Sequence, residues 1–313
     1  MDLRRSWPTI GLVALLVLDL FLVGWALWPT SPGATAGAVT ARVTAPASPT
    51  ATGTPSGGDT TTTGADAVTP RPLTRLVVPV GGTAVWAADV GSCTKPGRVY
   101  LSDDRGATWT SHAARGSVTR VRPDGASTAF AVGGDRGCRV RLWTTSDGGG
   151  SWNGPRSAAA AWGRSPGDAR RVNRPGGDPV TPCRGRSPVI DLAIVDGSRA
   201  TALCGDGTLR RTTDGGAGWR TGLTRTGAVA LALGSAGTGA VAWLEAECDG
   251  VVVGALAGDE LGTGRCVTGV DPAPGEVALG VAPSGVWLVA GDAVLRATEP
   301  GAAFERVSGW PAR

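Results

Sequence analysis

The sequence predicts an all-β domain built from repeated units, on three observations. A short turn motif recurs along the chain, and from Leu73 onward short apolar runs alternate with Gly and Asp. Such runs, bounded by turn residues, are typical of many short strands. A second marker, a large apolar residue preceded by small ones, recurs with a similar period. Self-similarity at a fixed period indicates a repeat architecture.

The turn motif carries a hydroxyl residue, an acid, a glycine and an aromatic residue at fixed offsets. An Asp side chain accepts hydrogen bonds from nearby backbone amides, glycine permits a positive φ, and the aromatic ring buries apolar area as the next strand begins. We interpret each copy as a structural turn and not as a catalytic or calcium site, because equivalent residues of separate repeats do not converge. The copies contain Ser102, Asp104, Gly106, Thr108 and Trp109; Thr145, Asp147, Gly149, Ser151 and Trp152; Thr212, Asp214, Gly216 and Trp219; and, in a worn form, Glu299, Gly301 and Phe304.

The second marker divides the domain into units. Its large residues are spaced by 44, 73, 40 and 44 positions, and the interval of 73 corresponds to one unit plus an insertion, residues 158–186. The large residues are Trp86, Phe130, Leu203, Trp243 and Trp287. The units are 73–115, 116–157, 187–227, 228–272 and 273–313.

The turn motif resembles the Asp-box, or BNR, repeat of sialidases, sortilin-type receptors, some glycoside hydrolases and photosystem assembly factors. The resemblance covers residues 73–313. It implies a β-propeller in which each box joins the third and fourth strands of a blade. With the five units, it predicts a five-bladed ring, because a sixth blade would require 158–186 to form one and that segment has no strand pattern. Residues 74–80 open blade 1 or complete the last blade.

The N-terminus predicts a membrane anchor. Residues 1–9 carry Arg4 and Arg5, and residues 10–28 are 19 mostly apolar positions, enough to cross a bilayer as a helix. The basic flank predicts a cytoplasmic N-terminus and an extracellular domain, in a single-pass protein of the cell membrane. The alternative is a cleaved signal peptide with a site at 34–36, which would make the protein secreted. Asp19 within the span is either a tolerated acid or the mark of a partner helix.

Residues 29–72 are rich in Thr, Ala, Pro and Gly and have almost no large apolar residues. A segment of this composition predicts a disordered linker. The 50 glycines and the single lysine, Lys95, are typical of a GC-rich genome, and we expect a Gram-positive bacterium. The net charge of +4 is small and dispersed, so nucleic acid is not an expected partner.

The insertion 158–186 is rich in arginine. Under the propeller resemblance, it lies on the face opposite the boxes, where ligands of this family usually bind. It is either a binding loop for a protein or an envelope glycan, or a solvated loop. Its arginines are Arg164, Arg170, Arg171, Arg174, Arg184 and Arg186.

Six cysteines in an exported domain predict three disulfides, with fifteen possible pairings. Cys93 and Cys138 fall in equivalent loops of neighbouring units, so we expect them to pair. The other expected pairs are Cys183 with Cys204 and Cys248 with Cys266, the last of which is a long reach along its strands. The only histidine is His112, and no Cys/His spacing suits zinc. We expect no metal and no cofactor.

The resemblance raises sialidase activity, which requires a Tyr–Glu nucleophile pair. The only tyrosine, Tyr100, is expected to be packed in a strand. Glu245 and Glu247 are a possible carboxylate pair, but we interpret them as solvated loop acids. The expected function is therefore a membrane-tethered, non-catalytic binding or scaffold module for a protein or cell-envelope polymer. The alternatives are a sialidase-like hydrolase or lectin, and an assembly factor for a membrane complex.

Overall fold

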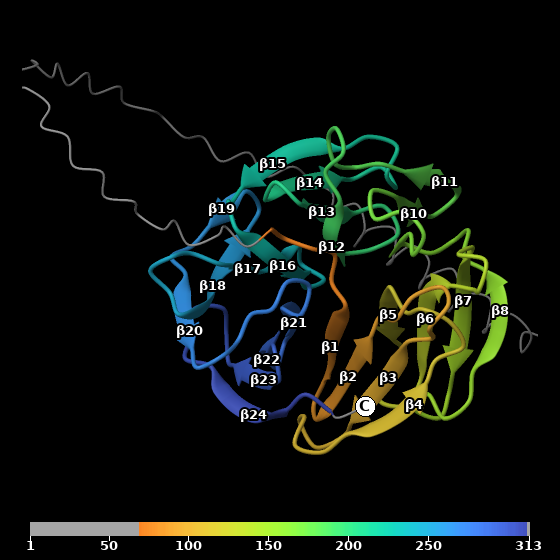
Figure 1. The fold of residues 1–313 in the computed structure, drawn as a ribbon, viewed down its shortest axis with the longest axis horizontal. Coiled ribbons are helices and arrows are strands. Elements are labelled where there is room, and N and C mark those ends of the chain that lie inside the picture. Colours follow the sequence, from red (N-terminus) through yellow and green to blue (C-terminus); the bar gives the residue numbers. More distant parts are fainter. Residues whose placement is uncertain (1–68, 312–313) are drawn as a thin grey trace, which may run out of the picture. The chain divides into compact units, whose positions relative to one another are not determined.

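The computed structural model describes residues 69–311, which contain six β-sheets and no helix. The sheets follow one another around a central axis in chain order, with the first strand of each nearest the axis (Figure 1). The fold is a six-bladed β-propeller. The predicted anchor at 10–28 and nearly all of the predicted linker lie outside the described residues. Over residues 69–311, no helix of a length and apolarity able to span a membrane is present.

Blades 1 and 2 are four-stranded antiparallel meanders, in which each strand pairs with the next one along the chain. Their strands are β1 (Arg75–Gly81), β2 (Ala84–Asp89), β3 (Arg98–Ser102) and β4 (Thr110–Ala113), then β5 (Arg120–Pro123), β6 (Ala129–Gly134), β7 (Val140–Thr145) and β8 (Asn153–Ser157).

Blades 4, 5 and 6 repeat this arrangement, with one extra short strand in blade 5. Their strands are β12 (Val189–Ile194), β13 (Ala200–Cys204), β14 (Thr208–Thr212) and β15 (Arg220–Thr224); β16 (Ala228–Leu233), β17 (Thr238–Trp243), β18 (Gly250–Ala257), β19 (Glu260–Leu261) and β20 (Arg265–Thr268); and β21 (Ala278–Ala282), β22 (Gly285–Ala290), β23 (Ala293–Ala297) and β24 (Glu305–Gly309).

Blade 3 corrects the sequence prediction of five blades. Residues 158–186, predicted to be a loop, contain the three-stranded sheet of β9 (Gly163–Arg164), β10 (Val172–Arg174) and β11 (Gly177–Val180). These strands are two to four residues long and carry Gly, Pro and Arg. The sequence therefore has no alternating apolar pattern here from which strands could be predicted. The sheet forms because β9 lies beside β6 and β12 of the neighbouring blades.

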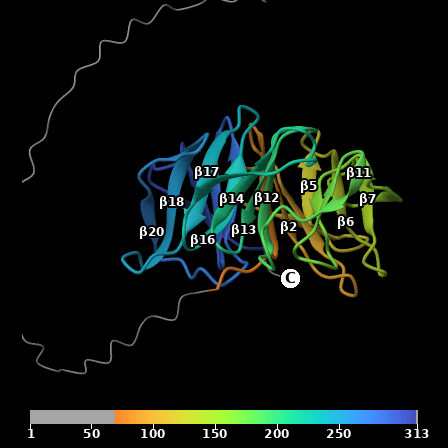
Figure 2. The same ribbon diagram turned by 90° about the horizontal axis from the view of Figure 1, so that it is seen from above.

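The ring has two distinct faces (Figure 2). Strand direction alternates within each four-stranded blade, so the turns between third and fourth strands, at 102–109, 145–152, 212–219 and 297–304, share one face. We call these the repeat turns and that face the repeat-turn face. Both ends of the described chain lie on the other face, the terminal face.

The ring closes where β1 lies beside β21, so residues 75–81 open blade 1 and are not the last strand of blade 6. Arg75 sits at this junction, donates to the carbonyl of Gly291 and lies 3.4 Å from Glu276. Its guanidinium also lies 4.9 Å from the ring centre of Trp310. Closure thus depends on a buried polar and aromatic contact between the first and last blades.

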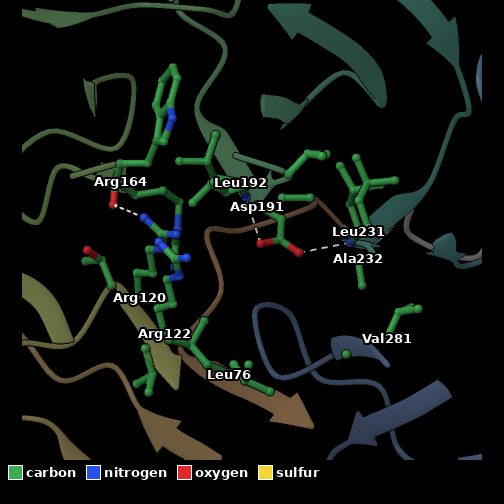
Figure 3. Close-up of a pocket in the computed structure, with 18 of the residues that line it drawn as sticks. Leu76, Arg120, Arg122, Arg164, Asp191, Leu192, Leu231, Ala232 and Val281 are labelled. Atoms are coloured by element: carbon green, nitrogen blue, oxygen red, sulfur yellow. Dashed lines mark hydrogen bonds between the residues drawn. The ribbon is translucent and has the colours of Figure 1, made fainter. Parts of the chain in front are cut away.

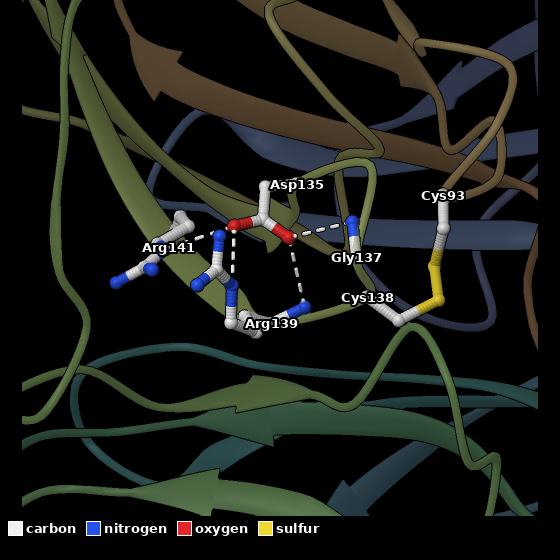
Figure 4. A network of polar contacts seen from close by, with 6 residues as sticks. All are labelled: Cys93, Asp135, Gly137, Cys138, Arg139 and Arg141. Atoms are coloured by element: carbon white, nitrogen blue, oxygen red, sulfur yellow. Dashed lines mark hydrogen bonds and ion pairs between the residues drawn. A yellow bond between two sulfur atoms is a disulfide. The ribbon is translucent and has the colours of Figure 1, made fainter.

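The structure joins the same three cysteine pairs that the sequence predicts, Cys93–Cys138, Cys183–Cys204 and Cys248–Cys266. The first connects the β2–β3 and β6–β7 loops of blades 1 and 2. Beside it, Asp135 accepts hydrogen bonds from the backbone of Gly137 and Arg139, and from the side chain of Arg141 (Figure 4). These loops are held together at the terminal face.

Candidate functional site: the axial pocket

A pocket of about 300 Å³ lies on the axis of the ring. The innermost strands of all six blades line it. Side chains alternate along a strand, so every second residue of these strands faces the axis and the others pack between blades. Val77 and Ala193, for example, are buried, whereas Val78 and Leu192 are only half-buried. All four residues belong to the lining of the pocket.

The segment before β1 forms the floor of the pocket on the terminal face. It crosses the axis from blade 4 to blade 1 (Figure 1). The backbone N–H of Leu73 donates to the carbonyl of Ile190 at 3.1 Å, and its carbonyl accepts from Arg164 at 2.8 Å. Leu73 is only 3% exposed. At the other end the pocket is lined by the β12–β13 turn, so it opens on the repeat-turn face.

Three arginines line one side of the pocket. Arg120 and Arg122 are two positions apart on β5, and Arg164 ends β9. Arg120 donates to the carbonyl of Trp162 at 3.1 Å, and the guanidinium carbons of Arg120 and Arg122 lie 5.3 and 5.7 Å from the ring centre of Phe130. None of the three forms an ion pair within residues 69–311.

Burial changes the pKa values of two of these arginines. It lowers the pKa of Arg120 to about 10, with a further contribution from the neighbouring charge of Arg122. Burial also lowers the pKa of Arg164, although the charge of Asp191 opposes that shift. Both arginines are protonated at neutral pH, since a guanidinium loses its proton only at high pH. An anion placed beside them would offset part of the cost of that burial.

Asp191 is the buried carboxylate of the pocket. Its two oxygens accept backbone hydrogen bonds from Leu192 at 2.7 Å and from Leu231, in blade 5, at 2.9 Å. Burial nevertheless raises the pKa of Asp191 above its usual range. The side chain therefore joins blades 4 and 5, and each of its oxygens already accepts one hydrogen bond. The pocket contains three arginines and this one buried acid, so its net charge is positive.

The opposite side of the pocket is apolar. Figure 3 shows Arg120, Arg122 and Arg164 on one side, Leu231, Ala232 and Val281 on the other, and Asp191 between them. The apolar side belongs to β1, β12, β16 and β21. The described residues hold no cluster of His, Cys, Asp and Glu suited to a metal ion. The pocket therefore combines a cationic side with an apolar side.

The residues of the repeat turns lie away from this pocket, at the rim of the ring. In blades 1 and 2, Asp104 and Asp147 each accept three hydrogen bonds within their own turn. The hydrogen bonds from Thr108 and Ser102 lower the pKa of Asp104 to about 2. The third turn lacks one hydroxyl donor because Gly218 replaces it. In each of these turns the side-chain hydrogen bonds join residues of the same turn.

The insertion arginines are spread over the third blade and are not gathered at one place. Arg164 lines the pocket, whereas Arg170 pairs with Asp168 at 3.1 Å. The others are distributed over the blade: Arg171 donates to Pro179, Arg174 to Asp178 and Gly215, and Arg184 and Arg186 are exposed.

The candidate catalytic residues also lie outside the pocket. Tyr100 is fully buried and donates to Asp89 at 2.8 Å, as expected of a packed strand residue. Glu245 accepts from Trp243 at 2.8 Å and pairs with Arg225. Glu247 is exposed in the β17–β18 loop. Neither acid is among the residues that line the axial pocket.

Sequence reasoning missed Arg120, Arg122 and Asp191. A signal was present: Thr119-Arg120-Val121-Arg122 opens the unit 116–157 and places two arginines on the same side of an innermost strand. Recognising it requires knowing which strand lies nearest the axis. Asp191 gave no such signal, because its partner Leu231 is forty positions away.

No family model and no curated protein matches the chain. Among solved structures, YCF48 bound to D1 peptide is 16% identical, with 76% of this chain and 82% of that chain covered and a TM-score of 0.28. The Aleuria aurantia lectin in complex with Fucα1-6GlcNAc is 9% identical, with 76% and 95% covered and a TM-score of 0.48. The xyloglucanase of Xanthomonas campestris is 13% identical, with 77% and 38% covered and a TM-score of 0.28. At these values the fold assignment depends on the strand topology of this chain itself.

Proposed function

We propose that the protein is a non-catalytic binding module, anchored in the membrane through residues 10–28, that binds an anionic group of a protein or cell-envelope polymer in the axial pocket. The observation that carries the proposal is the set of three arginines without ion pairs, facing a pocket closed at one end. Arg164 is buried, Arg120 is half-buried and Arg122 is exposed. Because buried charges are normally paired, such a set favours an anionic ligand as the missing partner.

The place where the chain enters the ring supports an outward-facing site. The first described residues lie on the terminal face, and the pocket opens on the repeat-turn face. A tether on the terminal face leaves the pocket mouth free to meet a partner. The three disulfides also favour an oxidising compartment, in agreement with an extracellular domain.

In-cell crosslinking of the full-length chain, followed by mass spectrometry, tests the proposal. We expect a reproducible set of captured proteins or envelope polymers that is lost from the Arg120→Ala/Arg122→Ala variant. The matched control is Arg170→Ala/Arg171→Ala, which removes the same charge from the insertion outside the pocket. Loss in the control and retention in the pocket variant would instead favour the insertion as the binding surface.

The alternative functions have direct readouts. Turnover of a glycoside by the full-length protein would overturn the non-catalytic proposal in favour of a hydrolase. Capture of wall glycan without protein would favour a lectin. Co-purification of a membrane complex that disappears in Asp19→Leu would favour an assembly factor that acts through its membrane span.

A further inference from the structure

The axial pocket also defines the chemistry of its ligand, and this inference rests on the proposed binding function. Its two sides differ: the cationic side comes from blades 2 and 3, and the apolar side from the other four blades. The apolar side includes Leu76, Val78, Leu233 and Val281, which are only half-buried in the protein. Apolar side chains left partly open in a cavity favour an apolar ligand body, since covering them is worth about 25 cal/mol per Å².

The polar groups available to a ligand are almost confined to the arginines. The hydroxyl of Thr119 already bonds the carbonyl of Val132, and Asp196 bonds Ser198 and Arg199. Asp191 already accepts two backbone hydrogen bonds. A sugar buried here would leave hydroxyl groups unpaired, at about 1–3 kcal/mol for each. The wall therefore disfavours a polyhydroxylated ligand.

The arginines retain donors for one oxyanion. Arg120 donates one N–H group to the carbonyl of Trp162, and Arg164 donates one to the carbonyl of Leu73. A guanidinium has five N–H donors, so both keep free donors, and a guanidinium with free donors can bind a carboxylate.

The closed floor determines how a ligand enters. Leu73 is fixed by hydrogen bonds at the terminal end, so a polymer does not thread through the ring. The volume of about 300 Å³ is at the small end of ligand pockets, roughly 300–1,000 Å³. The pocket accepts the end of a chain and not its middle.

We propose that the axial pocket binds the carboxylate-bearing end of an aliphatic chain, entering from the repeat-turn face. The carboxylate contacts Arg120, Arg122 and Arg164, and the aliphatic part lies along β1, β16 and β21. Such an end can belong to a short fatty acid or to the apolar C-terminal residue of a polypeptide. Both sources share the same recognition chemistry.

Calorimetric titration of the full-length protein, in a neutral detergent, tests this proposal. The probes are hexanoate, acetate, hexanamide and hexylammonium, with acetyl-Gly-Gly-Leu-Leu as a free acid and as an amide. We expect hexanoate, the free-acid peptide or both to bind, and acetate to bind at least tenfold more weakly. We expect hexanamide, hexylammonium and the peptide amide not to bind. Which acid binds more tightly identifies the source.

Two variants locate the binding. Arg120→Ala should weaken binding of the preferred acid at least tenfold, and Arg170→Ala should leave it unchanged. Val281→Asn, which makes the wall polar without adding a charge, should weaken hexanoate but leave acetate unchanged, because only the longer chain reaches the apolar wall. Circular dichroism confirms that each variant is folded.

The failures are distinguishable. If acetate and hexanoate bind equally, or if a neutral sugar binds more tightly, the aliphatic-carboxylate proposal is wrong while the pocket still binds a ligand. If no anion binds the full-length protein, including polyaspartate and polyphosphate, the proposed function fails as well.

Discussion

Blades 3 and 4 are neighbours in the ring, but only blade 4 has the sequence repeats that predict a blade. Blade 4 has the marker Leu203 in its second strand and a complete turn of Thr212, Asp214, Gly216 and Trp219. Blade 3 has neither, and its strands are two to four residues long. Both nevertheless occupy one position of the same ring. The comparison shows that a blade can be specified by its neighbours as well as by its own repeat.

Trp162 is the residue that makes the two kinds of blade compatible. A Cβ on Gly216, in the repeat turn of blade 4, would lie 2.9 Å from the Trp162 ring. In the same way, a Cβ on Gly106 in blade 1 would lie 2.8 Å from the Trp287 ring of blade 6. Trp162 thus packs against the next repeat turn as the marker tryptophan of an ordinary blade does.

The largest expected effect comes from Trp162→Ala. The ring is 1% exposed, packs edge-on against Trp219 at 6.1 Å and donates to the carbonyl of Asp196. Truncating a buried tryptophan costs about 3–5 kcal/mol, or roughly 10 °C of melting temperature for a domain of this size. Thermal unfolding of the full-length protein measures it. Trp219→Ala is the control with a smaller expected loss, and equal losses would contradict the special role of Trp162.

The next effect comes from the bridge between the two blades. Cys183 lies in the connector after β11, and Cys204 ends β13, 21 positions away. Replacing both by Ser should destabilise the protein by about 3 kcal/mol and should expose the β11–β12 connector to protease. The matched variant removes Cys248 and Cys266, which are 18 positions apart within blade 5. This variant should lose a similar amount of stability without exposing the β11–β12 connector to protease. Identical cleavage patterns in the two variants would contradict the proposed role of the Cys183–Cys204 bridge.

Smaller effects should separate the repeat turns themselves. Asp147 accepts from both the backbone and the hydroxyl of Ser151, whereas Asp214 has no hydroxyl partner at the matching position, Gly218. We therefore expect Asp147→Ala to lower the melting temperature more than Asp214→Ala. Glu299→Ala in the worn turn should have the least effect. A reversed order would show that the side-chain hydrogen bonds do not stabilise these turns.

The smallest effect is a dependence on pH. Hydrogen bonds lower the pKa of Asp104 to about 2 from a usual value of 3.8. A lowered pKa stabilises the folded state above the unfolded pKa, and this contribution is lost as pH falls from about 4 to 2. Asp191, with a raised pKa, acts in the opposite direction. Urea unfolding should show Asp104→Asn destabilising at pH 6 and nearly neutral at pH 2, and a constant difference would contradict the assignment.

The sequence by itself determined the repeat turns, the second strands and the approximate limits of five blades. Ser102, Asp104, Gly106 and Thr108 bond one another within seven positions, so their pattern is complete in a short segment. Trp86, Phe130, Leu203, Trp243 and Trp287 all fall in the second strands of their sheets, as expected. Local hydrogen bonding and side-chain alternation need no knowledge of the rest of the chain.

Only the tertiary structure decided the sixth blade and the pocket. Gly163 and Arg164 form a strand because Asn173 and Val172 pair with them and because blades 2 and 4 flank them. The pocket brings together arginines of two blades with a floor from residue 73, before the first strand. These contacts join segments dozens of positions apart, and no local preference of any one segment specifies them. Ring closure supplies the neighbours, and the neighbours then determine what the short segment becomes.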